Sequence, residues 1–459
     1  MLPSSLRQVK VMTMMKKLPK PTSTFILIGL VLLLVFQSKN LWLSFDTKSE
    51  DQAKIGDVDE FLQEILTPQR LIANFGDRDH YMTTDLGPYW KMTGENISEK
   101  LQKANSENLK LIDTEEYLNL QRQESLVFKF NSPLSGSVFV NLIGDKRNSN
   151  DINLSVDSIY ISNLGEIYIS GSKNFYKLVD IKVDFDIGEI LKEVKSKGIR
   201  AVNFYEAYGI KKDIYIPDED YISLQKVAYV SGLSNLEESM KSNLAERFLG
   251  IPIDYIREMT VDGKNTYVYE NEYLSLSSDG IIEYSLESQF DVKSRDLNKS
   301  LDRAVEFIAQ KTGISSGIYL EKIEPCDYND NLGYRFFFNL KDGQIPLVLP
   351  SKDHSFIEID VYSEFVKNYR EYYIRKDDNP IYKKEKINIE GIHRILRKNM
   401  ETFDYKPVMD ILSAIDNLNL VYLSSSGFQA QEPILVYEMA YMGRIYYFDV
   451  EDGSLMMVK

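Results

Sequence analysis

The pattern of apolar and polar positions divides this chain into one short apolar run near its start and a long amphipathic remainder. The run is Phe25–Phe36. As a helix it would rise about 18 Å, whereas a hydrocarbon core of roughly 30 Å needs about 20 residues. Thr22–Thr24 and Leu41–Leu43 can supply the missing length. The pattern therefore predicts a transmembrane anchor over residues 22–45, with Trp42 at interfacial depth.

A cleaved signal peptide is the alternative, because its apolar region has a similar length. No small-residue cleavage site follows Phe36. Basic residues precede the run, and no acidic residue occurs before Asp46. This charge asymmetry predicts a cytoplasmic N-terminus and an extracytoplasmic remainder. Residues 1–21 are then a cytoplasmic basic stub, and residues 46–57 a charged tether.

Beyond the tether, segments with helical spacing are interspersed with short segments of period 2. The predicted helices are Val58–Leu66, Pro88–Ala104, Asp113–Leu120, Ile187–Lys197, Asn235–Phe248, Leu297–Thr312 and Pro407–Asn417, with a basic helical patch near Ile389–Arg397. The predicted strands include Arg70–Phe75, His80–Thr84, Ser125–Phe130, Asp157–Ile161, Glu166–Ser170, Thr266–Tyr269, Tyr273–Leu276, Ile281–Tyr284, Gly317–Ile323, Tyr334–Leu340, Asn419–Leu423, Ile434–Ala440, Arg444–Val450 and Ser454–Val458.

Turn residues between neighbouring strands, such as Asp262-Gly263 and Asp279-Gly280, favour antiparallel meanders. The predicted fold class is therefore α+β: an N-terminal transmembrane helix followed by a multi-domain extracytoplasmic region of mixed helices and antiparallel sheets. The predicted domains are an N-terminal α/β domain at 58–210, a middle helix-plus-sheet domain at 211–292 and a C-terminal helix-plus-sheet domain at 293–459.

Charge narrows the range of partners. The formal net charge is −15 over 459 residues, and the first 45 residues contain six basic and no acidic side chains, so the remainder has a net charge of −21. Such a region is repelled by phosphates, which argues against nucleic-acid binding. Cys326 is the single cysteine, so the chain folds without an intramolecular disulfide.

Two motifs resemble those of serine enzymes. Gly313-Ile-Ser315-Ser-Gly317 matches G-x-S-x-G, but a helix is predicted before it and a strand after it, the reverse of a nucleophile elbow. Gly313 is better interpreted as the residue that ends the helix. Ser170-Gly-Ser-Lys173 and Lys311-Thr-Gly313 match S-x-x-K and K-T-G, but they lie at a strand end and a helix end, where the acyl-serine chemistry does not place them.

Metal and acid–base candidates are equally weak. Asp327–Asn331 imitates the start of a calcium loop, but Leu332 replaces the required glycine, so a hairpin loop is the better interpretation. The three histidines, which are widely spaced, are predicted to be surface or hydrogen-bonded core residues; they are His80, His354 and His393. The acidic pairs are interpreted as solvated faces or turns; they are Glu237-Glu238 and Glu451-Asp452. We expect no catalytic set, no metal site and no cofactor.

Several stretches resemble the YycH family, accessory regulators of the sensor histidine kinase YycG (WalK) in low-GC Gram-positive bacteria. They are QSKNLW after the apolar run, RLIANFGDRDHYMTTD, DIYIPDEDYISLQKVAYVSGLSNLEESMKSNLAERFLG, GKNTYVYENEYLSLSSDGIIEY and the tail GRIYYFDVEDGSL. The tail also resembles the closing hairpin of the partner protein YycI. The stub before the anchor is longer than is usual for the family.

The resemblance implies a non-enzymatic, single-pass cell-membrane protein that acts with a YycI-like protein on a YycG/WalK-like kinase and so tunes cell-wall metabolism. Contacts between membrane helices would involve Gly29 through close packing, Gln37 and Ser38 through hydrogen bonds, and Trp42 at the interface. Two other classes stay open. One is an extracytoplasmic PepSY-like module that binds or inhibits a wall hydrolase or wall polymer. The other is an exported hydrolase.

Overall fold

A computed structural model describes residues 61–459, except 63–64, 77, 85, 105, 136–154, 172–173, 226–228, 234–235, 314–316, 343–344, 351–354, 377–383 and 425–432. The predicted stub, anchor and tether lie outside the described residues, and so do Gly29, Gln37, Ser38 and Trp42. Within the described residues, no helix combines the length and apolar character that crossing a membrane requires.

The N-terminal half of the described chain forms a nine-stranded sheet in which every neighbouring pair is antiparallel. In spatial order the strands are β3 (Leu109–Ile112), β7 (Asn174–Lys182), β6 (Glu166–Gly171), β5 (Ser155–Ser162), β4 (Glu124–Ser135), β1 (Arg70–Phe75), β2 (His80–Thr83), β8 (Ile199–Asn203) and β9 (Tyr215–Pro217).

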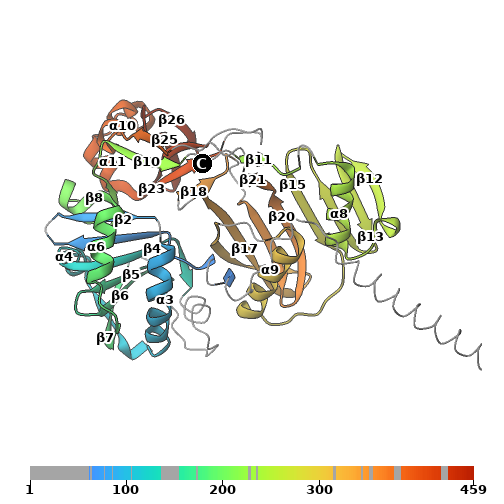
Figure 1. Ribbon diagram of the computed structural model, residues 1–459, viewed down its shortest axis with the longest axis horizontal. Coiled ribbons are helices and arrows are strands. Elements are labelled where there is room, and N and C mark those ends of the chain that lie inside the picture. The colour runs from blue at the N-terminus through green and yellow to red at the C-terminus, as the bar shows by residue number, and fades with distance from the viewer. Residues whose placement is uncertain are drawn as a thin grey trace, which may run out of the picture. The chain divides into compact units, whose positions relative to one another are not determined.

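Both faces of this sheet are covered. Helices α3 (Gly87–Gln102) and α6 (Gly188–Lys197) bury Trp90 and Val194 in the same apolar core as Leu126, and Figure 1 shows both helices on one side of the sheet. Helix α4 (Thr114–Leu120) buries Tyr117 against the opposite face with Val127. Successive strand residues point to opposite faces, so both faces need apolar residues when both are covered.

A second sheet of thirteen described strands spans residues 257–458. In spatial order its strands are β12 (Arg257–Val261), β13 (Lys264–Tyr269), β14 (Glu272–Leu276), β15 (Ile281–Leu286), β20 (Phe365–Tyr372), β19 (Ile357–Tyr362), β17 (Asn331–Asp342), β18 (Ile345–Val348), β23 (Ile415–Leu423), β24 (Ile434–Tyr441), β25 (Arg444–Asp449) and β26 (Leu455–Val458), with β16 (Ile318–Tyr328) paired to β17. The β18–β23 pair is parallel, so the sheet is mixed.

The remaining elements are short or lie against this sheet. They are α8 (Glu238–Leu249), α9 (Leu297–Lys311), α10 (Ile392–Lys398), α11 (Val408–Ala414), α7 (Phe204–Tyr208), the 3₁₀ turns Ser106–Asn108, Ile253–Tyr255 and Met400–Phe403, and two small ladders, β10 (Tyr221–Gln225) with β22 (Lys384–Asn388) and β11 (Tyr229–Ser231) with β21 (Ile374–Lys376).

Helix α9 shows how local signals set an element. Its N-cap Asp296 accepts a hydrogen bond from the backbone N–H of Lys299 at 3.0 Å. The helix ends with Gly313 in a left-handed conformation, φ +83°, as the sequence predicts. Its inner stripe buries Leu301, Val305 and Ile308. The apolar spacing predicts its start at Leu297 correctly, and the helix ends at Lys311, one residue before the predicted end at Thr312. The N-cap, which the sequence prediction does not use, agrees with that start.

The predicted fold class is wrong. The described chain is a mixed α/β fold in which strands outnumber helices, one strand pair is parallel, and the described helices include no membrane span. The helix predicted over Pro407–Asn417 ends at Ala414, because residues 415–417 join β23 and pair with β24. The domain boundaries stay predictions, although the boundary after residue 292 falls within the span of the second sheet.

The aromatic cluster under α8 and α9 yields a stability prediction. The Phe248 ring lies 6.0 Å from that of Phe307 and 5.8 Å from that of Tyr369, and it is fully buried. Phe248→Ala should lower the free energy of unfolding by about 3–5 kcal/mol through lost burial and a cavity. Urea unfolding followed by circular dichroism measures the loss. Tyr255→Ala, at a residue 73 % exposed, is the control, and a loss below about 1 kcal/mol in Phe248→Ala would contradict the packing described.

Candidate functional site

A row of polar side chains crosses four neighbouring strands of the nine-stranded sheet. In the strand register, Arg70 on β1 lies opposite Lys129 on β4. Lys129 in turn lies opposite Ser158 on β5, and Ser158 lies opposite Ser170 on β6. Residues directly opposite each other on antiparallel strands lie on the same face. The register therefore gathers on one face four polar residues that are up to 100 positions apart in the sequence.

This polar row forms one wall of an open pocket of about 480 Å³. The other walls come from Phe175, from the segment Lys211–Tyr215 and from Asp416–Leu418 of β23. The pocket therefore contains residues of the nine-stranded sheet and of the second sheet. A concave site with a few polar groups and apolar walls is the usual form of a small-molecule site.

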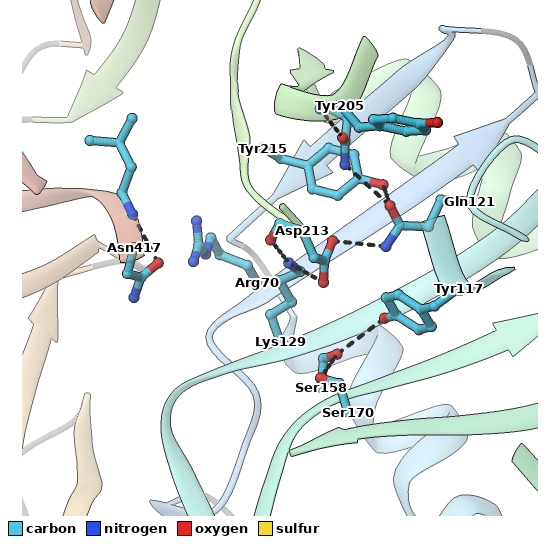
Figure 2. A network of polar contacts seen from close by, with 12 residues as sticks. Arg70, Tyr117, Gln121, Lys129, Ser158, Ser170, Tyr205, Asp213, Tyr215 and Asn417 are labelled. Carbon is cyan, nitrogen blue, oxygen red and sulfur yellow. Dashed lines mark hydrogen bonds and ion pairs between the residues drawn. The ribbon is translucent and has the colours of Figure 1, made fainter. Parts of the chain in front are cut away.

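Asp213 is the centre of the ion pairing in the pocket. Its Oδ2 lies 2.7 Å from Lys129 Nζ, and Lys129 Nζ also donates to the Asp213 carbonyl at 2.6 Å. Gln121 Nε2 donates to the other carboxylate oxygen at 2.8 Å. Figure 2 shows Lys129 and Gln121 converging on Asp213 from two directions. Both carboxylate oxygens of Asp213 are therefore already engaged.

Arg70 lies beside this pair and binds a neutral partner. Its Nη2 donates to Asn419 Oδ1 of β23 at 2.6 Å. Burial lowers the pKa of the Arg70 guanidinium, and the charges of Asp213 and Glu438 offset only part of this effect. Burial likewise lowers the pKa of Lys129, against the opposing effect of Asp213. Both cations are thus held in a poorly hydrated environment, where electrostatic interactions are stronger than in water.

A chain of hydroxyl groups continues the row. Tyr117 OH lies 3.3 Å from Ser158 Oγ, which lies 2.7 Å from Ser170 Oγ (Figure 2). Burial, followed by the charge of Asp213, raises the pKa of Tyr117 well above 10, so its phenol stays protonated at neutral pH. Each hydroxyl has one proton to donate, so the chain can present a donor at one of its ends.

A second polar row lies further along the same face, and it contains His80. The imidazole Nδ1 is 2.8 Å from Asn74 Oδ1, and Nε2 is 2.7 Å from Glu206 Oε2. Tyr215 OH joins the two rows, since it lies 2.9 Å from Gln121 Oε1 and 3.3 Å from Asn74 Oδ1. His80 is 1 % exposed. Its prediction as a surface or hydrogen-bonded core residue is therefore confirmed.

Of the other sequence candidates, Ser170 of the S-x-x-K match lines this pocket near the end of β6, where a strand end is predicted. Ser315, Lys173 and His354 lie outside the described residues. Lys311 ends α9, as predicted for the K-T-G match. His393 is exposed on α10, so its prediction as a surface or core residue is also confirmed. Among the described residues, no group of three or more His, Cys, Asp or Glu side chains is arranged to hold a metal ion.

The acidic sequence candidates also have structural roles. Asn329 and Asp330 adopt positive φ values of 46° and 63° in the turn between β16 and β17, which confirms the hairpin predicted there. Glu238 pairs with Lys241 on the surface of α8. Asp452 accepts a hydrogen bond from the Ser454 N–H at 2.7 Å in the last turn. Their interpretation as solvated faces and turns is confirmed.

Sequence reasoning missed the pocket, although one signal for it exists. In the predicted strand Ser125–Phe130, Lys129 falls on the same side as Val127, a buried residue, rather than on a polar face. A charged residue on a buried strand face needs a partner. The sequence does not indicate which residues lie opposite it, because pairing registers between distant strands leave no local pattern.

Comparisons with known proteins add little. No family model matches the chain, and no curated protein matches it. A crystal structure described as an uncharacterized protein from Eubacterium rectale ATCC 33656 is similar over 52 % of this chain and 87 % of that one, at 12 % sequence identity and a TM-score of 0.34. That likeness is too weak to carry an argument about function.

The ion pair in the pocket yields a second prediction. Asp213→Ala leaves Lys129, whose side chain is 12 % exposed, without its carboxylate partner. The free energy of unfolding should fall by about 3 kcal/mol, and Asp213→Ala/Lys129→Met should recover part of that loss. Urea unfolding of the single and double variants measures the coupling. Glu115→Ala, which breaks the exposed pair with Lys211, is the control and should leave stability unchanged. Additive losses in the double variant would contradict the proposed pairing.

Proposed function

We propose that this protein is a non-enzymatic extracytoplasmic regulator of a two-component sensor histidine kinase that controls cell-wall metabolism. Attachment to the membrane is proposed through the apolar segment Phe25–Phe36, in the part of the chain that is not described. The proposed partners are a YycG/WalK-like kinase and a YycI-like protein.

The observation that carries this proposal is that a stretch resembling the YycH family supplies residues of the pocket. The stretch beginning DIYIPDEDY starts at Asp213, and Asp213 and Tyr215 lie at the centre of the pocket and its hydrogen bonds. The tail that resembles YycI forms β25 and the turn into β26, in the same sheet as β23, which contributes the opposite wall. Two stretches of the resemblance, those that contain Arg70 and Asp213, therefore supply pocket residues, whereas the stretch that forms β13–β15 lies several strands away from β23.

The geometry supports binding rather than chemistry as the task of this site. Lys129 and Asp213 bind each other, and Arg70 binds Asn419 on β23. A molecule that competes for these groups would alter the contacts between the two sheets. A regulator needs such a change in contacts, because a ligand can shift an equilibrium only through different interactions with two states.

The kinase interaction is tested by co-purification of the full chain with a candidate kinase from detergent. Gly29→Leu should weaken association about fivefold or more, because close helix packing depends on small residues. Leu33→Ile in the same run is the matched control and should leave association unchanged. Full association after Gly29→Leu, or after replacement of the whole run by an unrelated apolar sequence, would contradict regulation through this segment. Capture of a wall hydrolase instead of a kinase would favour the PepSY-like inhibitor.

A further inference from the structure

The two cations on neighbouring strands of the pocket have different kinds of partner. Arg70 and Lys129 stand directly opposite each other on β1 and β4. Two like charges in such cross-strand positions repel each other. Burial is the main cause of the lowered pKa of Lys129, and the charge of Arg70 adds to it against the opposing charges of Asp213 and Asp157. A sheet accepts this arrangement when an anion lies between the two cations or beside them.

Asp213 forms a direct ion pair with Lys129, whereas it acts on Arg70, as Glu438 does, only from a longer distance. Its carboxylate bonds to Lys129 and to Gln121, and these contacts use both of its oxygens. Within the described part of the chain, no carboxylate lies within 4.0 Å of the Arg70 guanidinium, whose side-chain partner is the neutral Asn419. A guanidinium has five N–H donors in a planar fork, so Arg70 has capacity for a second partner.

The neighbouring groups suit an oxyanion. Ser158 and Ser170 are both more than 90 % buried, and both line the pocket in the same row as Arg70. When the hydroxyl chain is oriented from Tyr117 through Ser158, the last proton belongs to Ser170 and has no acceptor among the described residues. The row can thus offer a hydroxyl donor as well as the guanidinium.

We propose that this pocket binds a small molecule or peptide end that carries one carboxylate, with the carboxylate on Arg70 and its body against Phe175 and Ile214. The planar fork of arginine matches a carboxylate with two parallel hydrogen bonds. This site goes beyond the proposed function, since it exists whether or not a kinase is the partner.

A monocarboxylate fits better than a phosphate. The lining includes four basic side chains but also three acidic ones, Asp157, Asp213 and Asp416. Lys211 is further engaged by Glu115 outside the pocket. A dianion would therefore meet stronger repulsion from these carboxylates than a monocarboxylate, which requires only the free N–H donors of Arg70. The apolar walls favour an organic body over an inorganic ion.

The test uses isothermal titration calorimetry of the full chain in detergent at pH 7.5 with N-acetylglycine as the probe. We expect saturable binding in the millimolar range, as suits so small a ligand. Its neutral analogue N-acetylglycinamide and inorganic phosphate should each bind at least tenfold more weakly. Absence of saturable N-acetylglycine binding, or equal affinity for phosphate, would overturn the proposal.

Substitutions of pocket residues test whether N-acetylglycine binds in this pocket. Arg70→Gln should weaken N-acetylglycine binding at least tenfold, and Arg70→Lys, which keeps the charge but loses the fork, about three- to tenfold. Arg200→Gln, at a surface arginine 3.9 Å from Asp218, is the matched control and should bind as the unaltered chain does. Thermal melting verifies that each variant is folded. If Arg70→Gln does not fold, Ser170→Ala replaces it, with about threefold weaker binding expected. Unchanged affinity in the folded Arg70 variants, or in Ser170→Ala, would exclude this pocket.

Discussion

Placing two cations side by side on a covered sheet face is the constraint on which the pocket depends. Arg70 and Lys129 are fixed opposite each other by the β1–β4 register, so neither can move away without shifting a strand. Asp213 enters from the loop before β9 and neutralises Lys129, while Asn419 reaches Arg70 from β23. The two buried cations on β1 and β4 therefore require polar partners, and the loop that contains Asp213 and the strand β23 supply them.

The two faces of the nine-stranded sheet differ in what covers them. In the nine-stranded sheet, the face beneath α3 and α6 is filled by apolar residues such as Leu126 and Phe128, which supply stability. The opposite face has an apolar centre around Val127 and Tyr160 with polar rows beside it. The larger apolar core therefore lies on one side of this sheet, and the polar rows lie on the other beside a smaller one.

Much of the local structure could be predicted from the sequence. The sequence predicts strand β1 with both boundaries, and helix α9 through its apolar stripe and its terminal glycine, because these signals are local. Prediction failed where tertiary pairing overrides local preference. Residues 415–417 fit a helical pattern, but pairing with β24 takes them into a strand. The fold class was wrong partly because the β18–β23 pair is parallel, and sequence spacing does not reveal which distant strands meet.

The sequence by itself determined the alternation of apolar residues, the acidic charge and the positions of turns, because each depends on residues close together along the chain. It also provided one hint of the site, since Lys129 falls on the same strand side as the buried Val127. Only the tertiary structure decided that Arg70, Lys129, Ser158 and Ser170 form one row and that Asp213 and Asn419 meet it. Apart from the β5–β6 hairpin, these contacts join residues far apart in the sequence, and no short turn between them fixes their register.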